Sequence, residues 1–175
     1  MSADTQSKPT LAARPGQAGI DPRSPRFGAG ITAVLLLAVV GLGLAAPLGE
    51  TIGQRALEPT FVLLAVITLL FGWGAFAGVQ RHPYGRLYRA IVRPRLAPPK
   101  ELEDPAPPTF AQGVGFLITL IGVVLQLVGV PYGLVIAAGA AFIAAFLNTV
   151  FDYCLGCQIY LLLLRAGVIR RTVAA

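Results

Sequence analysis

The chain has 175 residues, of which 55% are hydrophobic and only 13% are charged, and its formal net charge is +6. A soluble domain carries about 25% charged residues, so this composition excludes an ordinary water-soluble protein and indicates a membrane protein of one domain. A basic chain can also bind nucleic acid, but here the basic residues stand between long apolar runs, which excludes that class.

Four apolar runs are long enough to cross a bilayer. Because a helix rises 1.5 Å per residue, about 20 residues cover roughly 30 Å of hydrocarbon. We expect spans at about residues 28–48, 59–80, 110–130 and 132–151. They predict an all-α fold, a four-helix membrane bundle over residues 21–165. Residues 1–20 are expected to form a disordered tail, and residues 166–175 a C-terminal tail.

Lys and Arg lie almost entirely on one side of the predicted spans. Thirteen of the 14 basic residues precede the first span, stand between the second and third, or follow the last, and only Arg55 lies elsewhere. Because cytoplasmic loops collect Lys and Arg, we expect both termini and the middle loop inside the cell. The predicted location is the inner (plasma) membrane, with the lipid bilayer as a partner.

The middle loop opens with a pattern that predicts a short amphipathic helix. Apolar side chains recur at the i, i+3, i+4, i+7 spacing of one helical face: Tyr84, Leu87, Tyr88 and Ile91. Arginines occupy other positions on the same wheel: Arg86, Arg89 and Arg93. Tyrosines and arginines together favour the headgroup layer, so we expect an interfacial helix whose arginines face lipid.

Small residues at a spacing of four mark the expected helix contacts. Gly74 and Gly78 form a GxxxG pattern in the second span, and Ala137, Ala141 and Ala145 repeat the spacing in the fourth. Helices in lipid associate through close backbone approach, which such residues allow. The pattern predicts packing within the bundle, and a homodimer is the alternative.

The only two cysteines, Cys154 and Cys157, form a Cys-x-x-Cys motif near the end of the fourth apolar run. Residues i and i+3 of a helix share a face, so the two sulfurs can close or exchange a disulfide without another part of the chain. A thiol at a helix N-terminus is more acidic, and the thiolate is the reactive form. In the reducing cytoplasm we expect the dithiol as the resting state.

Two other interpretations of the motif stay open. The cysteines can be small packed residues without chemistry. They can also form half of a zinc site that two chains share, because one chain adds only His82 and Asp152 to a set that needs four ligands. We expect no bound cofactor and no metal site within a single chain.

The depth of Asp152 depends on where the fourth helix ends. If it ends at Phe151, Asp152 emerges at the interface, the helix breaks between Asp152 and Gly156, and residues 155–164 form an interfacial or re-entrant segment. If it continues to Arg165, the carboxylate lies roughly 20 Å deep at a cost of several kcal/mol. The first placement leaves fewer polar groups in lipid, and we favour it.

In that placement Arg81 and His82, at the inner end of the second span, lie at the depth of the cysteines. A cation there stabilises a thiolate, and Asp152 is a candidate proton acceptor. His82 can equally be an interface residue without a chemical task.

Several ordered motifs carry a family resemblance. They are Asp21-Pro22-Arg23-x-Pro25-Arg26-Phe27, Pro83-Tyr84-Gly85-Arg86-Leu87, Leu102-Glu103-Asp104-Pro105 and Cys154-Leu155-Gly156-Cys157. Over residues 20 to 165 the chain resembles a family of small bacterial, mainly actinobacterial, membrane proteins known as a domain of unknown function. The resemblance implies a four-span fold and neighbouring thioredoxin-like or sulfurtransferase proteins, and it assigns no catalytic residue.

Taken together, these features predict a thiol-redox or sulfur-relay membrane protein. Cys154 and Cys157 would exchange with a soluble cytoplasmic partner of the thioredoxin-like or sulfurtransferase class. The alternative is a non-catalytic scaffold or accessory subunit whose basic cytoplasmic face recruits a partner or anionic lipid. A transporter has little support, because only Gln126, Asn148 and Asp152 are clearly polar in or near the spans.

Overall fold

The computed structural model describes residues 11–13, 16–45 and 47–169, and the elements in these ranges are helical. Four helices are long and apolar enough to cross a membrane: α1 (Arg23–Ala45), α3 (Pro59–Ala77), α5 (Ala106–Val128) and α6 (Gly133–Phe151). The predicted all-α fold with four membrane-spanning helices is therefore confirmed. Each predicted span overlaps one of these helices, with differences of a few residues at the ends.

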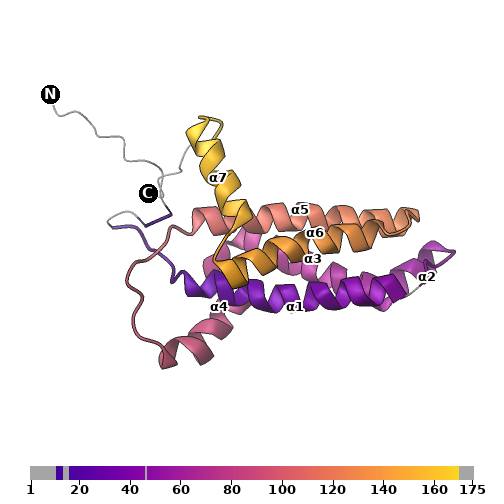
Figure 1. The fold of residues 1–175 in the computed structure, drawn as a ribbon, viewed down its shortest axis with the longest axis horizontal. Coiled ribbons are helices and arrows are strands. Elements are labelled where there is room, and N and C mark those ends of the chain that lie inside the picture. The colour runs from indigo at the N-terminus through magenta and orange to yellow at the C-terminus, as the bar shows by residue number, and fades with distance from the viewer. Residues whose placement is uncertain (1–10, 14–15, 46, 170–175) are drawn as a thin grey trace.

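The four long helices lie side by side, and the remaining elements sit at the two ends of the bundle (Figure 1). One end carries α2 (Ile52–Leu57) and the turn between α5 and α6. The other end carries the chain before α1, the segment between α3 and α5, and α7 (Leu155–Arg165), which stands across the bundle axis. We call these the α2 end and the α7 end.

The segment between α3 and α5 contains a short, irregular helical stretch. It comprises a 3₁₀ turn at Val79–Arg81, α4 (Pro83–Leu87), a π-helical turn at Tyr88–Val92 and a second 3₁₀ turn at Arg93–Arg95. Tyr88 is buried against the bundle, whereas Leu87 and Ile91 are exposed. The predicted single apolar face is therefore divided into one side toward the protein and one away from it.

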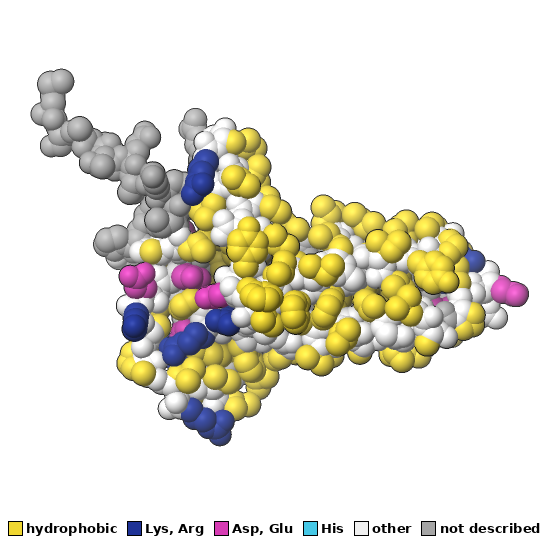
Figure 2. All heavy atoms as spheres, in the orientation of Figure 1, with side chains coloured by type: hydrophobic (Ala, Val, Ile, Leu, Met, Phe, Trp, Pro, Cys, Tyr) yellow, Lys and Arg dark blue, Asp and Glu magenta, His cyan; other side chains and the backbone are white. Residues whose placement is uncertain are grey.

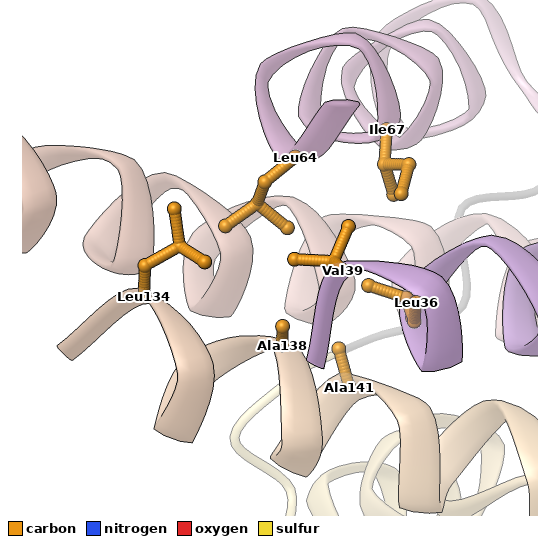
Figure 3. Close-up of a cluster of buried hydrophobic side chains, with 7 residues drawn as sticks. All are labelled: Leu36, Val39, Leu64, Ile67, Leu134, Ala138 and Ala141. Atoms are coloured by element: carbon orange, nitrogen blue, oxygen red, sulfur yellow. The ribbon is translucent and has the colours of Figure 1, made fainter. Parts of the chain in front are cut away.

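The core lies between α1, α3 and α6. Its buried members are Leu36, Val39, Leu64, Ile67, Leu134, Ala138 and Ala141, and they point toward one another from three helices (Figure 3). Small alanines of α6 allow close helix approach here. Of the three alanines at the predicted spacing of four, Ala141 belongs to this core, next to Ala138, whereas Ala137 packs against Gly122 of α5. The outer surface of the long helices is largely apolar (Figure 2), as a lipid-facing surface must be.

Glycines provide the other close helix contacts, but only one of the two GxxxG glycines does so. A Cβ built on Gly74 would lie 2.7 Å from the Gln112 side chain, so this glycine packs α3 against α5. Gly78 instead ends α3 with a positive φ of 81°, and a Cβ there would meet no atom within 4 Å. The positive φ that glycine adopts easily lets the chain turn out of the helix at Gly78.

The start of the chain contacts the segment before α5. Leu11, Ala13 and Ile20, in the stretch expected to be a disordered tail, form backbone hydrogen bonds with residues 102–104, including Ile20 N–H to Glu103 O at 2.9 Å. Residues 1–10 lie outside the described ranges. The helix α1 begins at Arg23 rather than after Phe27, because a proline such as Pro25 fits the first turn of a helix.

The contact between Gly122 and Ala137 gives a test of the packing of α5 on α6. A Cβ on Gly122 would lie 2.6 Å from the Ala137 Cβ, whereas a Cβ on Gly139 meets open space. We expect Gly122→Leu to lower the free energy of unfolding in detergent by about 1–3 kcal/mol through overpacking. Gly139→Leu is the control and should change it little. Equal stabilities of the two variants would contradict this packing.

Candidate functional site

Helix α7 begins at the first cysteine of the Cys-x-x-Cys motif. Cys154 is the N-cap residue, with an extended backbone (φ −85°, ψ 99°), and its Sγ accepts a hydrogen bond from the Cys157 N–H at 3.3 Å. The sulfur therefore lies at the positive end of the helix dipole, among N–H groups that have no carbonyl partner. This position stabilises a thiolate.

The second cysteine lies one turn into α7. The two sulfur atoms form a disulfide, with Cα atoms 5.2 Å apart. The two residues differ in exposure, because Cys154 is half-buried and Cys157 is only 4% exposed. A molecule that approaches the motif from outside therefore reaches Cys154 first.

Contacts with the start of α5 hold α7 in place. The buried face of α7 consists of Cys157, Tyr160 and Leu161. The Tyr160 ring lies 5.6 Å from the Phe110 ring. A Cβ on Gly156 would lie 2.5 Å from the Ala111 Cβ, so Gly156 allows the first turn of α7 to touch α5. Gly156 thus lies inside a helix and does not break one.

The break between α6 and α7 occurs at Asp152. Helix α6 ends at Phe151, and Asp152 adopts the left-handed conformation (φ 57°, ψ 28°) that commonly terminates helices. The Tyr153 N–H then donates to the Leu147 carbonyl at 3.2 Å. Of the two placements considered for the fourth helix, the structure has the one that keeps Asp152 out of the span, with its side chain 67% exposed.

Arg26, at the start of α1, connects a second helix to this turn. Its guanidinium donates to the Thr149 carbonyl at 2.8 Å and to the Val150 carbonyl at 3.3 Å, and it lies 3.7 Å from the Asp152 carboxylate. The ion pair is exposed and contributes little. The bonds to the last carbonyls of α6 matter more, because those groups have no partner within the helix.

Among the described residues, neither His82 nor Arg81 forms a side-chain hydrogen bond or ion pair with the Cys-x-x-Cys motif. The His82 ring is buried, its Nε2 lies 3.1 Å from the Leu70 carbonyl and its Nδ1 accepts the Tyr84 N–H at 3.2 Å. Burial lowers the pKa of His82, so the ring is held neutral. The Arg81 side chain is exposed. The hydrogen bond at the Cys154 sulfur comes instead from the N-terminus of α7, through the Cys157 N–H.

A buried polar network beside the site was missed in the sequence. Asp21 accepts hydrogen bonds from the Arg23 guanidinium at 2.9 and 2.8 Å and from the Tyr88 hydroxyl at 3.1 Å. The bond from Arg23 lowers the pKa of Asp21. Arg23 also donates to the Ala97 carbonyl at 3.0 Å, so one carboxylate ties the start of α1 to the irregular segment between α3 and α5. No sequence signal pointed to it, because helix periodicity assigned Tyr88 to an apolar face and nothing linked it to Asp21.

Glu103 and Asp104 lie where this segment returns to α5. Asp104 is buried, and its carboxylate accepts the Ala106 N–H at 2.9 Å at the start of that helix. Burial, and then the negative charges of Asp152 and Asp21, raise the pKa of Glu103. Glu103 therefore holds a proton up to a higher pH than an ordinary glutamate does.

The two sides of α7 differ in polarity. Leu155, Ile159 and Leu162 share an exposed apolar side, at the i, i+4, i+7 spacing. Gln158 and Arg165 lie on another side. Figure 2 shows apolar side chains along the side of α7 that faces the bundle's apolar surface, and a basic side chain on the opposite side. Such a distribution fits a helix that lies in the plane of a membrane surface.

Within the described ranges, His, Cys, Asp and Glu side chains form no group of three or more that could hold a metal ion. The structure therefore offers no protein-only metal centre in these ranges. A zinc site shared between two chains stays a prediction.

These features define a multi-pass membrane protein of four apolar helices with a Cys-x-x-Cys motif at the start of a transverse helix. The family model described as Domain of unknown function (DUF4395) matches residues 20–165, and the chain belongs to this family. No curated protein and no solved structure matches the chain.

The Asp21 network predicts a pH dependence of stability. Because the pKa of Asp21 is lower in the folded protein than its ordinary value near 3.8, its contribution is present above that value and is lost as the pH falls through the folded-state pKa. We expect Asp21→Asn to reduce the free energy of unfolding by about 1–3 kcal/mol at pH 7 and to change it little in strong acid. Unfolding in detergent at both pH values measures this.

The control is Glu101→Gln, which makes the same carboxylate-to-amide change at an exposed position. This control should leave the stability unchanged at both pH values. A loss from Asp21→Asn that is equally large in strong acid would contradict the role of the charge.

Proposed function

We propose that the protein is a membrane-bound thiol carrier of the thiol-redox or sulfur-relay type. The observation that supports it is the position of Cys154, a half-buried residue whose sulfur caps the N-terminus of α7, with the buried Cys157 one turn further on. This arrangement pairs a stabilised, reachable thiolate with a second thiol that can resolve a mixed disulfide. Two packed cysteines without chemistry would not require a difference in exposure.

The proposed redox cycle begins with the dithiol. The Cys154 thiolate attacks one sulfur of a partner disulfide, the partner S–S bond breaks, and the leaving thiolate takes a proton. The Cys157 thiolate then attacks the Cys154 sulfur, which releases the second partner thiolate and forms the Cys154–Cys157 disulfide. Two electrons pass to the partner, which is reduced to a dithiol while the motif is oxidised.

A sulfur relay would use the same first residue. The Cys154 thiolate attacks the terminal sulfur of a partner persulfide, the partner S–S bond breaks, and the partner leaves as a thiolate. Cys154 then carries the sulfur as a persulfide. Cys157 can attack the inner sulfur, which releases the terminal sulfur as hydrosulfide and closes the disulfide. Both versions require a soluble partner with a sulfur–sulfur bond.

The charge distribution supports an orientation with the α7 end in the cytoplasm. Every described Lys and Arg except Arg55 belongs to a segment at this end, and basic side chains gather there in Figure 2. Since positive residues are retained inside, both chain ends and the motif would face the cytoplasm of the cell membrane. A thioredoxin-like or sulfurtransferase protein could then reach Cys154 from water.

A scaffold without catalysis is the second candidate, and one observation favours it. The irregular helical segment between α3 and α5 has three exposed arginines, Arg86, Arg89 and Arg93. The exposed apolar residues Leu87 and Ile91 belong to the same segment. Such a surface suits anionic headgroups or an acidic partner. This candidate requires no reactive thiol, so the experiment below separates it from the carrier.

Oxidised glutathione tests the carrier directly, in inverted vesicles that expose the cytoplasmic face. We expect reduced Cys157→Ser protein to form a stable mixed disulfide at Cys154, seen by mass spectrometry, because no second thiol resolves it. Wild-type protein should instead become the internal disulfide. Cys154→Ser should react slowly, since Cys157 is buried.

Right-side-out vesicles provide the control for orientation, because oxidised glutathione does not cross the bilayer and should leave Cys154 unmodified. A Cys157→Ser protein that forms no adduct in either type of vesicle would refute the carrier and leave the scaffold. An adduct only in right-side-out vesicles would reverse the orientation. An adduct in inverted vesicles then justifies using the same variant to trap a partner.

A further inference from the structure

The α2 end of the bundle contains a cavity of about 150 Å³, at the opposite end from the cysteines. It lies between the ends of α1, α3, α5 and α6, and its lining includes Leu48, Glu58, Thr60, Gln126, Tyr132 and Val135. No feature of the proposed thiol chemistry uses it. The mixture of polar and apolar residues in the cavity lining therefore needs a functional explanation of its own.

Two polar side chains of the lining are more than nine-tenths buried. Thr60 is 3% exposed, and within the described residues its hydroxyl has no hydrogen-bond partner. Gln126 is 6% exposed, and its side-chain amide donates to the Glu58 carboxylate, which leaves the amide oxygen without a donor among the described residues. No fully buried side-chain nitrogen or oxygen of the described residues lacks a hydrogen-bond partner. The Thr60 and Gln126 oxygens therefore keep accessible surface, and both can accept a hydrogen bond from a molecule in the cavity.

The charge of the cavity is negative. Glu58 accepts the Gly49 N–H at 2.8 Å in addition to the Gln126 amide, and among the described residues it forms no ion pair. The nearby Arg55 does not neutralise it. The Arg55 guanidinium is taken up by the carbonyl groups of Gly49 at 2.6 Å, Leu127 at 3.1 Å and Glu50 at 2.9 Å. The cavity thus offers acceptors and one carboxylate without a cation.

The rest of the lining suits a small apolar group. Leu48, Leu134 and Val135 form part of the wall. Tyr132, an exposed aromatic residue of the lining, adopts the left-handed conformation (φ 59°) that bulky residues rarely take. An aromatic ring near a carboxylate is a common combination in sites for organic ammonium ions, because the ring face attracts a cation.

We propose that this cavity binds a small organic ammonium ion, a protonated primary amine with a short alkyl chain. The ammonium group would donate to the Glu58 carboxylate, the Gln126 amide oxygen and the Thr60 hydroxyl, and the alkyl chain would contact Leu134 and Val135. A metal ion would leave the apolar wall unused, and a neutral alcohol would leave the carboxylate without a cation. The site is independent of the cysteines.

Thermal unfolding of the full chain in detergent tests the site with n-propylammonium chloride as the probe, at constant ionic strength against sodium chloride. We expect a saturable rise in the unfolding midpoint with propylammonium and none with propan-1-ol, which has the same size without the charge. Glu58→Gln should weaken the apparent affinity about ten- to a hundredfold. Glu50→Gln, an exposed carboxylate at the same end, should not.

Two further variants keep the test decisive if Glu58→Gln does not fold. Leu48→Trp fills the cavity while leaving Glu58 in place, and Thr60→Val removes only the unpartnered hydroxyl. The first should abolish the shift, and the second should weaken it. No shift in the wild-type protein, an equal shift with propan-1-ol, or an unchanged shift in Leu48→Trp would each overturn the proposal.

Discussion

A backbone that leaves the helical conformation inside hydrocarbon carries N–H and C=O groups that no water can satisfy. In the described residues of this chain, every break between the long helices lies at one of the two bundle ends. Each break also brings its own partners, such as Arg26 for the last carbonyls of α6 and Arg55 for the carbonyls around α2. The chain can therefore place irregular, chemically active segments only at the ends, and the cysteines follow this constraint.

At the α7 end, the backbone turn at Asp152 sets the position of the cysteines relative to the start of α7. If α6 continued past Phe151, Cys154 would lie mid-helix, with its N–H bonded and no dipole end nearby. Because Asp152 takes the left-handed conformation, the chain turns and a new helix starts at Leu155. The same event moves a carboxylate out of the span and converts Cys154 into an N-cap. The proposed reactivity of Cys154 thus depends on where α6 ends.

The sequence was sufficient to predict the four long helices, because length and hydropathy alone constrain a membrane span. It was also sufficient to find Cys154 and Cys157, since they are the only cysteines. It did not reveal that Gly156 contacts Ala111, or that Gly78 turns the chain instead of packing it. Gly74 and Gly78 belong to the same GxxxG pattern, and only the position of the neighbouring helix α5 distinguishes them. The contacts of Asp21 with Tyr88 join residues 67 positions apart, which no periodicity encodes.

The central claim is that the N-terminus of α7 makes Cys154 the reactive thiol, and the alkylation rate as a function of pH tests it most directly. Reduced Cys157→Ser and Cys154→Ser proteins, each with one thiol, are treated with iodoacetamide in inverted vesicles. The account predicts that Cys154 reacts with a midpoint below about pH 8.5, the ordinary value for a thiol, and about tenfold or more faster at pH 7 than Cys157. Equal, slow rates with midpoints at or above that value would contradict it.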